Sequence, residues 1–320
     1  RLDTHEGIQA FKKQAQGFQK QSPKKYLQGT KNVNCSGTYI TESKNAQKSY
    51  LVKGGEDLKY VQFINEAPNK DCFDISVWGT HSELAYEYAS SGSGLYNSRF
   101  LVDCWPNIRN VEYALHCNSS SDLFGCVGLR NKQYCILNKQ YTKEAYEELV
   151  PKIKQHMIDM PYKDSKGLIY TYGEFFPIEF SWYGYNNTLA QEFFPIEEND
   201  AKEKGYAWYE IPQSNYEATI DAKDLPLEIA LTNDTICKEI IACENCPKKY
   251  RIVENELLFL RRMSLPVPHI CPDCRYAERI SHRLTTELFE RPCMKAGCTE
   301  VFLTGYNPKA GDIVYCEKHY

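Results

Sequence analysis

The chain has 320 residues, 14 of them cysteine, with 42% hydrophobic and 25% charged residues. This length predicts two or three domains, and the cysteine content lies below that of a small disulfide-rich scaffold. A net charge of −4 excludes a uniformly basic nucleic-acid coat and disfavours attachment to anionic membranes through charge alone. Because no run of about 18 apolar residues occurs, we expect no membrane span and no membrane partner.

The two ends of the chain suggest truncation. The first residue is Arg1 rather than Met, and no signal-peptide core follows it. The last residue, Tyr320, comes directly after a metal-type motif. We therefore expect either end to be open to truncation or processing.

Residues 1–30 predict a basic amphipathic helix. Residues 1–31 hold seven Lys and Arg against two Asp and Glu, a local excess of 7 − 2 = 5. A docking helix with a solvated basic face is favoured over polyanion binding. Over 4–21 the apolar side chains fall on one helical face: Ile8, Phe11, Ala15 and Phe18.

Residues 31–160 predict a β-rich, repeat-like domain that ends in a helix. The 22-residue intervals from Tyr50 to Cys72 and from Cys104 to Cys126 suit the coils of a parallel β-solenoid, with an antiparallel fold as the alternative. In this region single cysteines recur beside a polar residue or a glycine: Cys35, Cys72, Cys104, Cys117, Cys126 and Cys135.

We expect these six thiols to be buried packing, since free cysteine is among the most buried residue types. The sequence gives no reason to pair His81, His116 or His156 with any of them as a base, so no catalytic residue is assigned. The closing helix is expected to be capped by Thr142 and to end at Pro161.

Residues 161–204 contain an aromatic repeat. The hexapeptide Glu-Phe-Phe-Pro-Ile-Glu occurs at 174–179 and again at 192–197. Because proline is excluded from a helix interior, both copies are predicted to be extended edges or loops. Packing against the preceding domain is favoured over a peptide- or base-stacking surface. Residues 205–236 are predicted to be a tether, with a short helix near 227–231.

Residues 237–320 carry the strongest chemical signal, a predicted double zinc-binding module. Two CxxC pairs, Cys243 with Cys246 and Cys271 with Cys274, offer four thiolates for a tetrahedral zinc ion. The order of knuckle, short middle, knuckle and helix is typical of a treble clef or zinc ribbon. Cys237 stands just before these pairs and has no assigned role.

A second site is predicted directly after the first. Cys293, Cys298, Cys316 and His319 give a Cys₃His set, in which Gly297 permits the tight turn between the first two ligands. Each set has four protein ligands, so neither leaves a position for an activated water. Both ions are therefore expected to be structural.

A basic ridge follows Cys274 on a predicted helix. Arg275, Arg279 and Arg283 recur at i, i+4 and i+8, with His282 beside them. This ridge could hold the phosphates of RNA or DNA. The alternative is a solvated face that Glu278 and Glu287 partly neutralise. Residues 237–320 have 13 Lys and Arg against 11 Asp and Glu, an excess of only 13 − 11 = 2.

Three segments together resemble a known family. They are Leu123–Tyr141 (LFGCVGLRNKQYCILNKQY), Gly173–Pro177 (GEFFP) and the cysteine array Cys243–His319. They are similar to uncharacterised bacterial proteins usually described as probable zinc-ribbon or zinc-binding proteins, over most of residues 20–320. The resemblance implies zinc binding by both ligand sets and brings no established activity, substrate or catalytic residue.

The sequence as a whole favours a non-catalytic zinc-binding or scaffold protein with two structural zinc ions, and RNA or DNA is the first expected partner. The alternatives are a nuclease-like enzyme with structural zinc, and an assembly module that binds a protein partner or a second copy of itself. Because zinc binding needs reduced thiols, a cytoplasmic location is expected.

Overall fold

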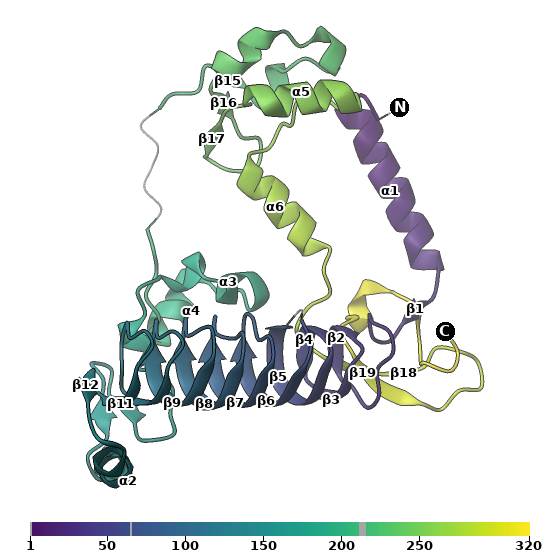
Figure 1. Cartoon of the computed structure of the whole chain (residues 1–320). Helices are drawn as coiled ribbons and strands as arrows, with labels where there is room; N and C mark the ends of the chain where they lie inside the picture. The colour runs from purple at the N-terminus through teal and green to yellow at the C-terminus, as the bar shows by residue number, and fades with distance from the viewer. Residues whose placement is uncertain (1, 65, 211–215) are drawn as a thin grey trace. The chain divides into compact units, whose positions relative to one another are not determined.

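The computed structural model describes residues 2–64, 66–210 and 216–320 (Figure 1). Within these ranges the chain forms two compact units. The predicted module at 237–320 is divided between them, and residues 211–215 of the predicted tether lie outside the described residues. The first unit contains Arg1–Lys24, Glu210–Leu284 and Gly311–Ile313, and the second contains Lys25–Tyr209, Thr285–Ala310 and Val314–Tyr320.

Most of the second unit is a parallel β-solenoid, which confirms the predicted fold (Figure 1). It makes about eight turns within the described residues. The strands from β2 to β11 pair in parallel, and β12 turns back antiparallel to β11. Their bounds are β2 Gly37–Thr41, β3 Lys44–Gln47, β4 Ser49–Lys53, β5 Gly55–Ile64, β6 Asn69–Ser76, β7 Ser82–Ala89, β8 Leu95–Val102, β9 Ile108–Leu115, β10 Ser121–Phe124, β11 Gln133–Ile136 and β12 Lys139–Gln140.

The coils are shorter than predicted. Cys72 pairs with Ala85, 85 − 72 = 13 residues further on, so the predicted coil of 22 residues is wrong. The 22-residue interval joined cysteines at different positions of the coil. Cys104 lies one coil from Cys117, whose backbone N–H donates to the Cys104 sulfur at 3.5 Å, 13 residues apart.

Every third residue of a coil points inward. In β7, Ser82, Ala85 and Tyr88 are buried, whereas an ordinary strand alternates with period two. Each inward residue is followed by an outward residue and then by one with positive φ, such as Leu84 at 53° and Glu87 at 44°. The positive φ bends the chain, so the next inward position comes after three residues.

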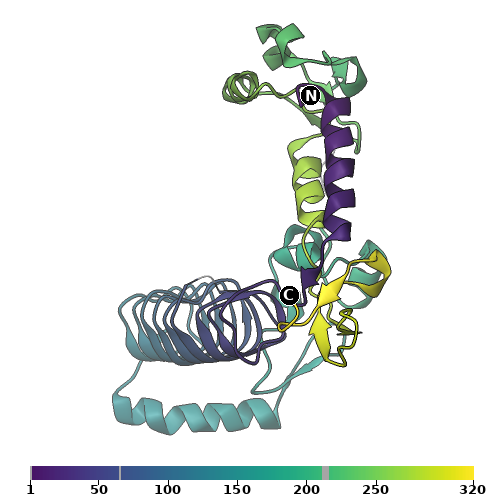
Figure 2. The ribbon, with the colours of Figure 1, turned by 90° about the vertical axis from the view of Figure 1, so that its right-hand side faces the viewer.

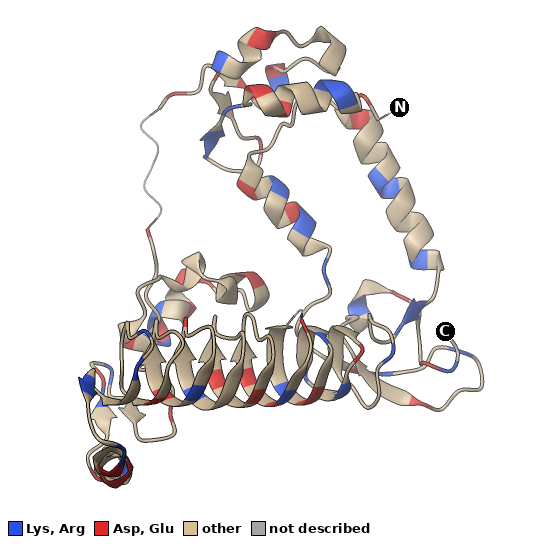
Figure 3. Cartoon of the chain, viewed as in Figure 1, with Lys and Arg blue, Asp and Glu red and all other residues tan. Residues whose placement is uncertain are grey.

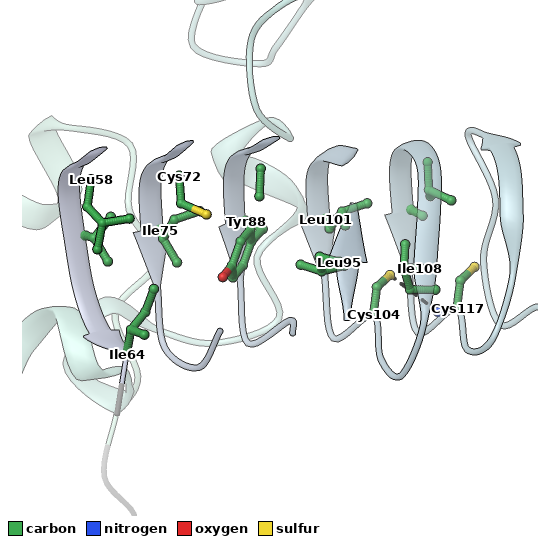
Figure 4. Close-up of a cluster of buried hydrophobic side chains, with 14 of the residues drawn as sticks. Leu58, Ile64, Cys72, Ile75, Tyr88, Leu95, Leu101, Cys104, Ile108 and Cys117 are labelled. Atoms are coloured by element: carbon green, nitrogen blue, oxygen red, sulfur yellow. Dashed lines mark hydrogen bonds between the residues drawn. The ribbon is translucent and has the colours of Figure 1, made fainter. Parts of the chain in front are cut away.

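Equivalent inward residues stack from coil to coil and form one continuous core (Figure 4). Five of the six single cysteines are buried in it, and Cys35 is half-buried against it. The prediction that these thiols serve as packing is confirmed. Their small side chains fit where neighbouring coils approach to about 4.8 Å, the spacing of hydrogen-bonded strands.

Polar ladders run along the outside of the solenoid and fix its register. Asn97 donates through its side-chain amide to Asn110 at 2.9 Å, and Asn110 donates to Asp122 at 3.0 Å. These three residues have positive φ, which Asn and Asp tolerate better than other side chains. On another row Lys44 pairs with Glu56 at 2.9 Å, within a stripe where both charges occur (Figure 3).

Helix α2 (Lys143–Asp159) packs beside the last coils. Thr142 caps it by accepting a hydrogen bond from the backbone of Ala145 at 3.3 Å, as predicted. Its apolar face contacts Phe124 and Ile136 in a second cluster of buried side chains. The helix is seen end-on in Figure 1 and side-on in Figure 2, so it runs across the direction in which the coils stack.

The two identical hexapeptides adopt different structures. Glu174–Pro177 is a loop, as predicted, whereas Glu192 and Phe193 end the short helix α3 (Leu189–Phe193), so the prediction is wrong for the start of the second copy. Both copies pack on the solenoid. Phe176 lies 5.9 Å from Tyr113 and Phe193 lies 6.4 Å from Phe63, measured between ring centroids.

The first unit is built from three helices and a small sheet, counted over its described residues. The helix predicted at 4–21 is present as α1 (His5–Gln21), with Thr4 as its cap. None of the helices in the described chain is long and apolar enough to cross a membrane. The other elements are α5 Glu254–Met263, α6 Pro272–Ser281, β15 Ile220–Asp221, β16 Ile241–Ala242 and β17 Lys249–Tyr250.

We expect Leu101→Ala to lower the free energy of unfolding by about 2–5 kcal/mol, because Leu101 is fully buried between neighbouring coils and truncation leaves a cavity. Leu137→Ala is the matched control. Leu137 is 76% exposed, so its truncation should change the same quantity by less than about 0.5 kcal/mol. Denaturant titration followed by circular dichroism measures both, and equal losses would contradict this description of the core.

Candidate metal centres

The first cysteine cluster lies in the first unit and has the dimensions of a metal site. The ligand atoms of Cys243, Cys246, Cys271 and Cys274 all lie within 4.8 Å of one another. Two of the sulfur–sulfur distances, Cys243 to Cys274 and Cys246 to Cys271, are 3.8 Å. A tetrahedron with Zn–S bonds of about 2.3 Å has S···S edges of about 3.8 Å, so the cluster fits such an ion.

Local structure brings the first four ligands together. Strands β16 and β17 are antiparallel, and the turn between them carries Cys243 and Cys246. Cys271 is the N-cap of α6, and its sulfur accepts a hydrogen bond from the backbone of Cys274 at 3.5 Å. Pro272 occupies the first helical position, where its missing N–H costs nothing. The sulfur of Cys271 therefore faces the positive end of the helix dipole.

Backbone N–H groups favour the thiolate form in this cluster. Burial raises the pKa of the Cys243 thiol, but hydrogen bonds from the backbone, among them that of Cys271 at 3.2 Å, lower it to about 7. A thiolate is the form that binds a metal ion. The cluster is thus electrostatically prepared for a cation.

The second cluster lies in the second unit. Cys293, Cys298, Cys316 and His319 also place their ligand atoms within 4.8 Å of one another. The sulfurs of Cys298 and Cys316 are 4.0 Å apart, and the Nδ1 atom of His319 lies 3.1 Å from the Cys316 sulfur and 3.8 Å from that of Cys293. These values surround the edge lengths of a tetrahedral site with three sulfur ligands and one nitrogen ligand.

A β-hairpin and a short turn position the second cluster. Strands β18 (Phe289–Pro292) and β19 (Val301–Thr304) pair antiparallel, and the loop between them carries Cys293 and Cys298. Gly297 in this loop has φ 81°, the conformation for which glycine was predicted. The pKa of Cys293 is raised by burial, but the N–H of Cys316, at 3.3 Å, and other donors lower it to about 6.

The second cluster packs on the first coil of the solenoid. Thr304, at the end of β19, donates through its hydroxyl to the carbonyl of Tyr26 at 2.6 Å, and the rings of Tyr26 and Phe302 are 5.0 Å apart. Gln28 in turn accepts a backbone hydrogen bond from Ile40 of β2 at 3.0 Å. The sequence did not indicate this contact, because the paired segments are about 280 residues apart.

The predicted arginine ridge is partly engaged within the first unit. Arg275 forms an ion pair with Glu256 at 2.7 Å, so its charge is compensated. Arg279 is exposed and lies 5.7 Å above the ring of Tyr276 on the same helix. His282 is the C-cap of α6, directly before Arg283. Glu278 binds Lys12 of α1 at 2.5 Å, so the predicted neutralisation also involves the N-terminal helix.

Cys237 is separate from both clusters. It is half-buried against the core of the first unit, and burial raises the pKa of its thiol. It therefore belongs with packing and lacks the electrostatic setting of a ligand.

Comparisons with known protein families, with curated proteins and with solved structures found no match to this chain. The resemblance to probable zinc-ribbon proteins therefore stays a prediction. What the structure supports is two cysteine-rich groups that could each hold a metal ion.

We expect Cys246→Ser and Cys298→Ser each to lower the metal content by about one ion per chain, because a hard hydroxyl replaces a soft thiolate in a different cluster. Elemental analysis of purified protein measures this. Cys237→Ser is the matched control and should keep the full content. Equal loss in all three variants would show that the clusters do not bind separate ions.

Proposed function

We propose that this chain is a zinc-dependent, non-catalytic binding protein, in which metal-stabilised modules support a β-solenoid that presents the binding surface. One observation carries the non-catalytic part. Each cluster offers four ligand atoms within 4.8 Å, which fills a tetrahedral ion and leaves no position for water or substrate. Catalytic zinc sites in contrast use three protein ligands and an open position.

The donor sets support zinc as the metal. Thiolate sulfur and imidazole nitrogen suit zinc, whereas magnesium and calcium prefer oxygen ligands. Four thiolates in a tetrahedron also suit iron, so the 3.8 Å sulfur–sulfur distances alone do not choose between the two metals. The Cys₃His set favours zinc. In the first cluster, two ligands on the first turn of α6 and two on a preceding hairpin support a treble-clef arrangement.

A scaffold role is supported by the solenoid itself. Stacked coils present long rows of equivalent positions, which is how repeat proteins form extended binding surfaces. Exposed aromatic side chains follow such rows here, among them Tyr60, Phe73 and Tyr86. A large outward aromatic side chain is costly unless it serves contact with a partner.

Metal removal should destabilise the protein. A site that holds zinc at about 1,000 times its Kd adds about 4 kcal/mol to the free energy of unfolding. We therefore expect a strong chelator to lower the thermal midpoint markedly, and added zinc, rather than magnesium, to restore it. Thermal melts with elemental analysis of the same samples test this. An unchanged midpoint in metal-free protein would contradict zinc dependence.

Nucleic-acid binding through α6 is the second candidate. It is favoured by the exposed pair of Arg279 and Tyr276, since a guanidinium beside an aromatic ring can contact phosphate and base together. The ion pair of Arg275 with Glu256 speaks against a fully cationic ridge.

If α6 binds RNA, charge reversal by Arg279→Glu with Arg283→Glu should weaken the binding of a single-stranded oligonucleotide. It should also reduce the slope of log Kobs against log salt by about 0.7 for each lost phosphate contact. Fluorescence anisotropy at several salt concentrations measures both quantities. Lys309→Glu, on an exposed residue of the other unit, is the control. Equal effects of the two substitutions would rule out a site on α6.

A further inference from the structure

An open pocket lies on the outer face of strands β6 to β8. Its volume is about 530 Å³, within the usual range for ligand sites. Phe73 and Tyr86 are each 39% exposed and Leu84 is 45% exposed, so the pocket has an apolar floor that faces solvent. Its polar side chains are Asp71, Asn97 and Arg99.

The pocket continues a surface that the chain already covers with its own residues. Tyr86 meets Phe100 edge to face at 5.9 Å, and Phe100 stacks on Tyr113 at 4.5 Å. From Phe100 onward this row lies under an irregular segment, in which Tyr172 and Phe176 contact Tyr113 at 6.2 and 5.9 Å. The covered and open parts therefore form one aromatic row along the solenoid.

The covering segment shows which chemistry suits this row. It is Gly173–Pro177, an extended stretch that contains the first acidic–aromatic–aromatic–proline motif. The hydroxyl of Tyr113 accepts from the backbone of Gly173 and donates to the carbonyl of Glu174, both at 3.0 Å. Aromatic contacts and backbone hydrogen bonds together hold a peptide without regular structure.

The second copy of the motif repeats the behaviour elsewhere on the solenoid. Phe193 contacts Phe63, and the backbone carbonyl of Phe193 accepts a hydrogen bond from Thr286 at 3.0 Å. Two copies in different secondary structures thus dock on aromatic positions of the coils. The shared element is the aromatic–proline sequence rather than its backbone conformation.

Charge completes the match to an acidic motif. The Arg99 side chain lines the pocket, and its contact with Glu112 is long, at 3.9 Å. The Glu112 carboxylate already receives the Lys154 ammonium at 2.7 Å and the Tyr172 hydroxyl at 2.8 Å. With five N–H donors, Arg99 can bind a second carboxylate at the mouth of the pocket.

We propose that this pocket, formed by Phe73, Leu84, Tyr86 and Arg99, binds an extended segment of a partner protein that carries the acidic–aromatic–aromatic–proline motif. The motif's rings lie on Phe73 and Tyr86, and its acidic residue pairs with Arg99. Proline keeps the segment extended and lowers the entropy lost on binding. The proposal specifies a partner class for the proposed scaffold role and rests on that role.

A direct binding measurement tests the proposal. The full chain, with its metal content assayed in parallel, is titrated into fluorescein-labelled Gly-Glu-Phe-Phe-Pro-Ile-Glu and followed by anisotropy. We expect saturable binding that weakens at least about tenfold on Phe73→Ser combined with Tyr86→Ser, as at interface hot spots. Tyr96→Ser is the matched control, because Tyr96 is 38% exposed on the neighbouring row and does not line the pocket.

A double-mutant cycle isolates the charge contact. Arg99→Gln should weaken the binding of the Glu peptide but leave unchanged the binding of a peptide with Gln at both acidic positions. Circular dichroism confirms that each variant folds. Absence of saturable binding by metal-loaded wild-type protein would overturn the peptide proposal and leave the zinc proposal intact.

Sedimentation separates the other occupant. If the wild-type chain self-associates and Phe73→Ser with Tyr86→Ser abolishes this association, a second copy occupies the pocket and the partner proposal is wrong. A monomer that binds the peptide supports the proposal.

Discussion

A stack of parallel coils must cover its two ends, and the second unit is organised around this constraint. Each terminal coil leaves a row of backbone N–H and C=O groups that could pair with another chain. At the start of the solenoid, residues 25–28 pair with the first coil and are themselves held by Thr304 and Tyr315 of the second cluster's module. At the other end β12 folds back antiparallel, and α2 covers the adjoining outer face.

The cover at the first end is itself a metal module. Its hairpin β18–β19 is two strands long, which is too small to be stable alone in water. Four ligands around one ion give such a module the cohesion that its small core lacks. Metal binding at Cys293 and its partners is therefore coupled to the closure of the solenoid. The first unit uses the same device beside a larger apolar core that includes Ile241 and Val267.

The sequence predicted those features that depend on local spacing. The CxxC pairs, the cap at Thr142 and the glycine at 297 each need only a few neighbouring residues, and the structure has all three as expected. The solenoid was predicted from its buried cysteines, but its coil length was not. The period of three requires positive φ at residues such as Leu84 and Glu87, whose side chains do not favour it.

Long-range contacts decided what the sequence did not indicate. Identical hexapeptides differ in structure because their neighbours on the solenoid differ, which local propensity does not encode. The cysteine-rich region was predicted to be one module, yet its two clusters lie in different units. The open pocket was missed because Phe73, Tyr86 and Arg99 are 13 residues apart, and only the 13-residue period would have aligned them.

The 13-residue period also makes the solenoid modular in evolution. Each coil contacts chiefly the coil before and the coil after it, so a whole coil could be gained or lost while the remaining interfaces are kept. One such event would change the length of the outer rows by about 4.8 Å and leave both ends in place. An insertion of one or two residues within a coil would instead rotate every inward side chain out of the core. Length variation among descendants of this gene should therefore come in whole coils.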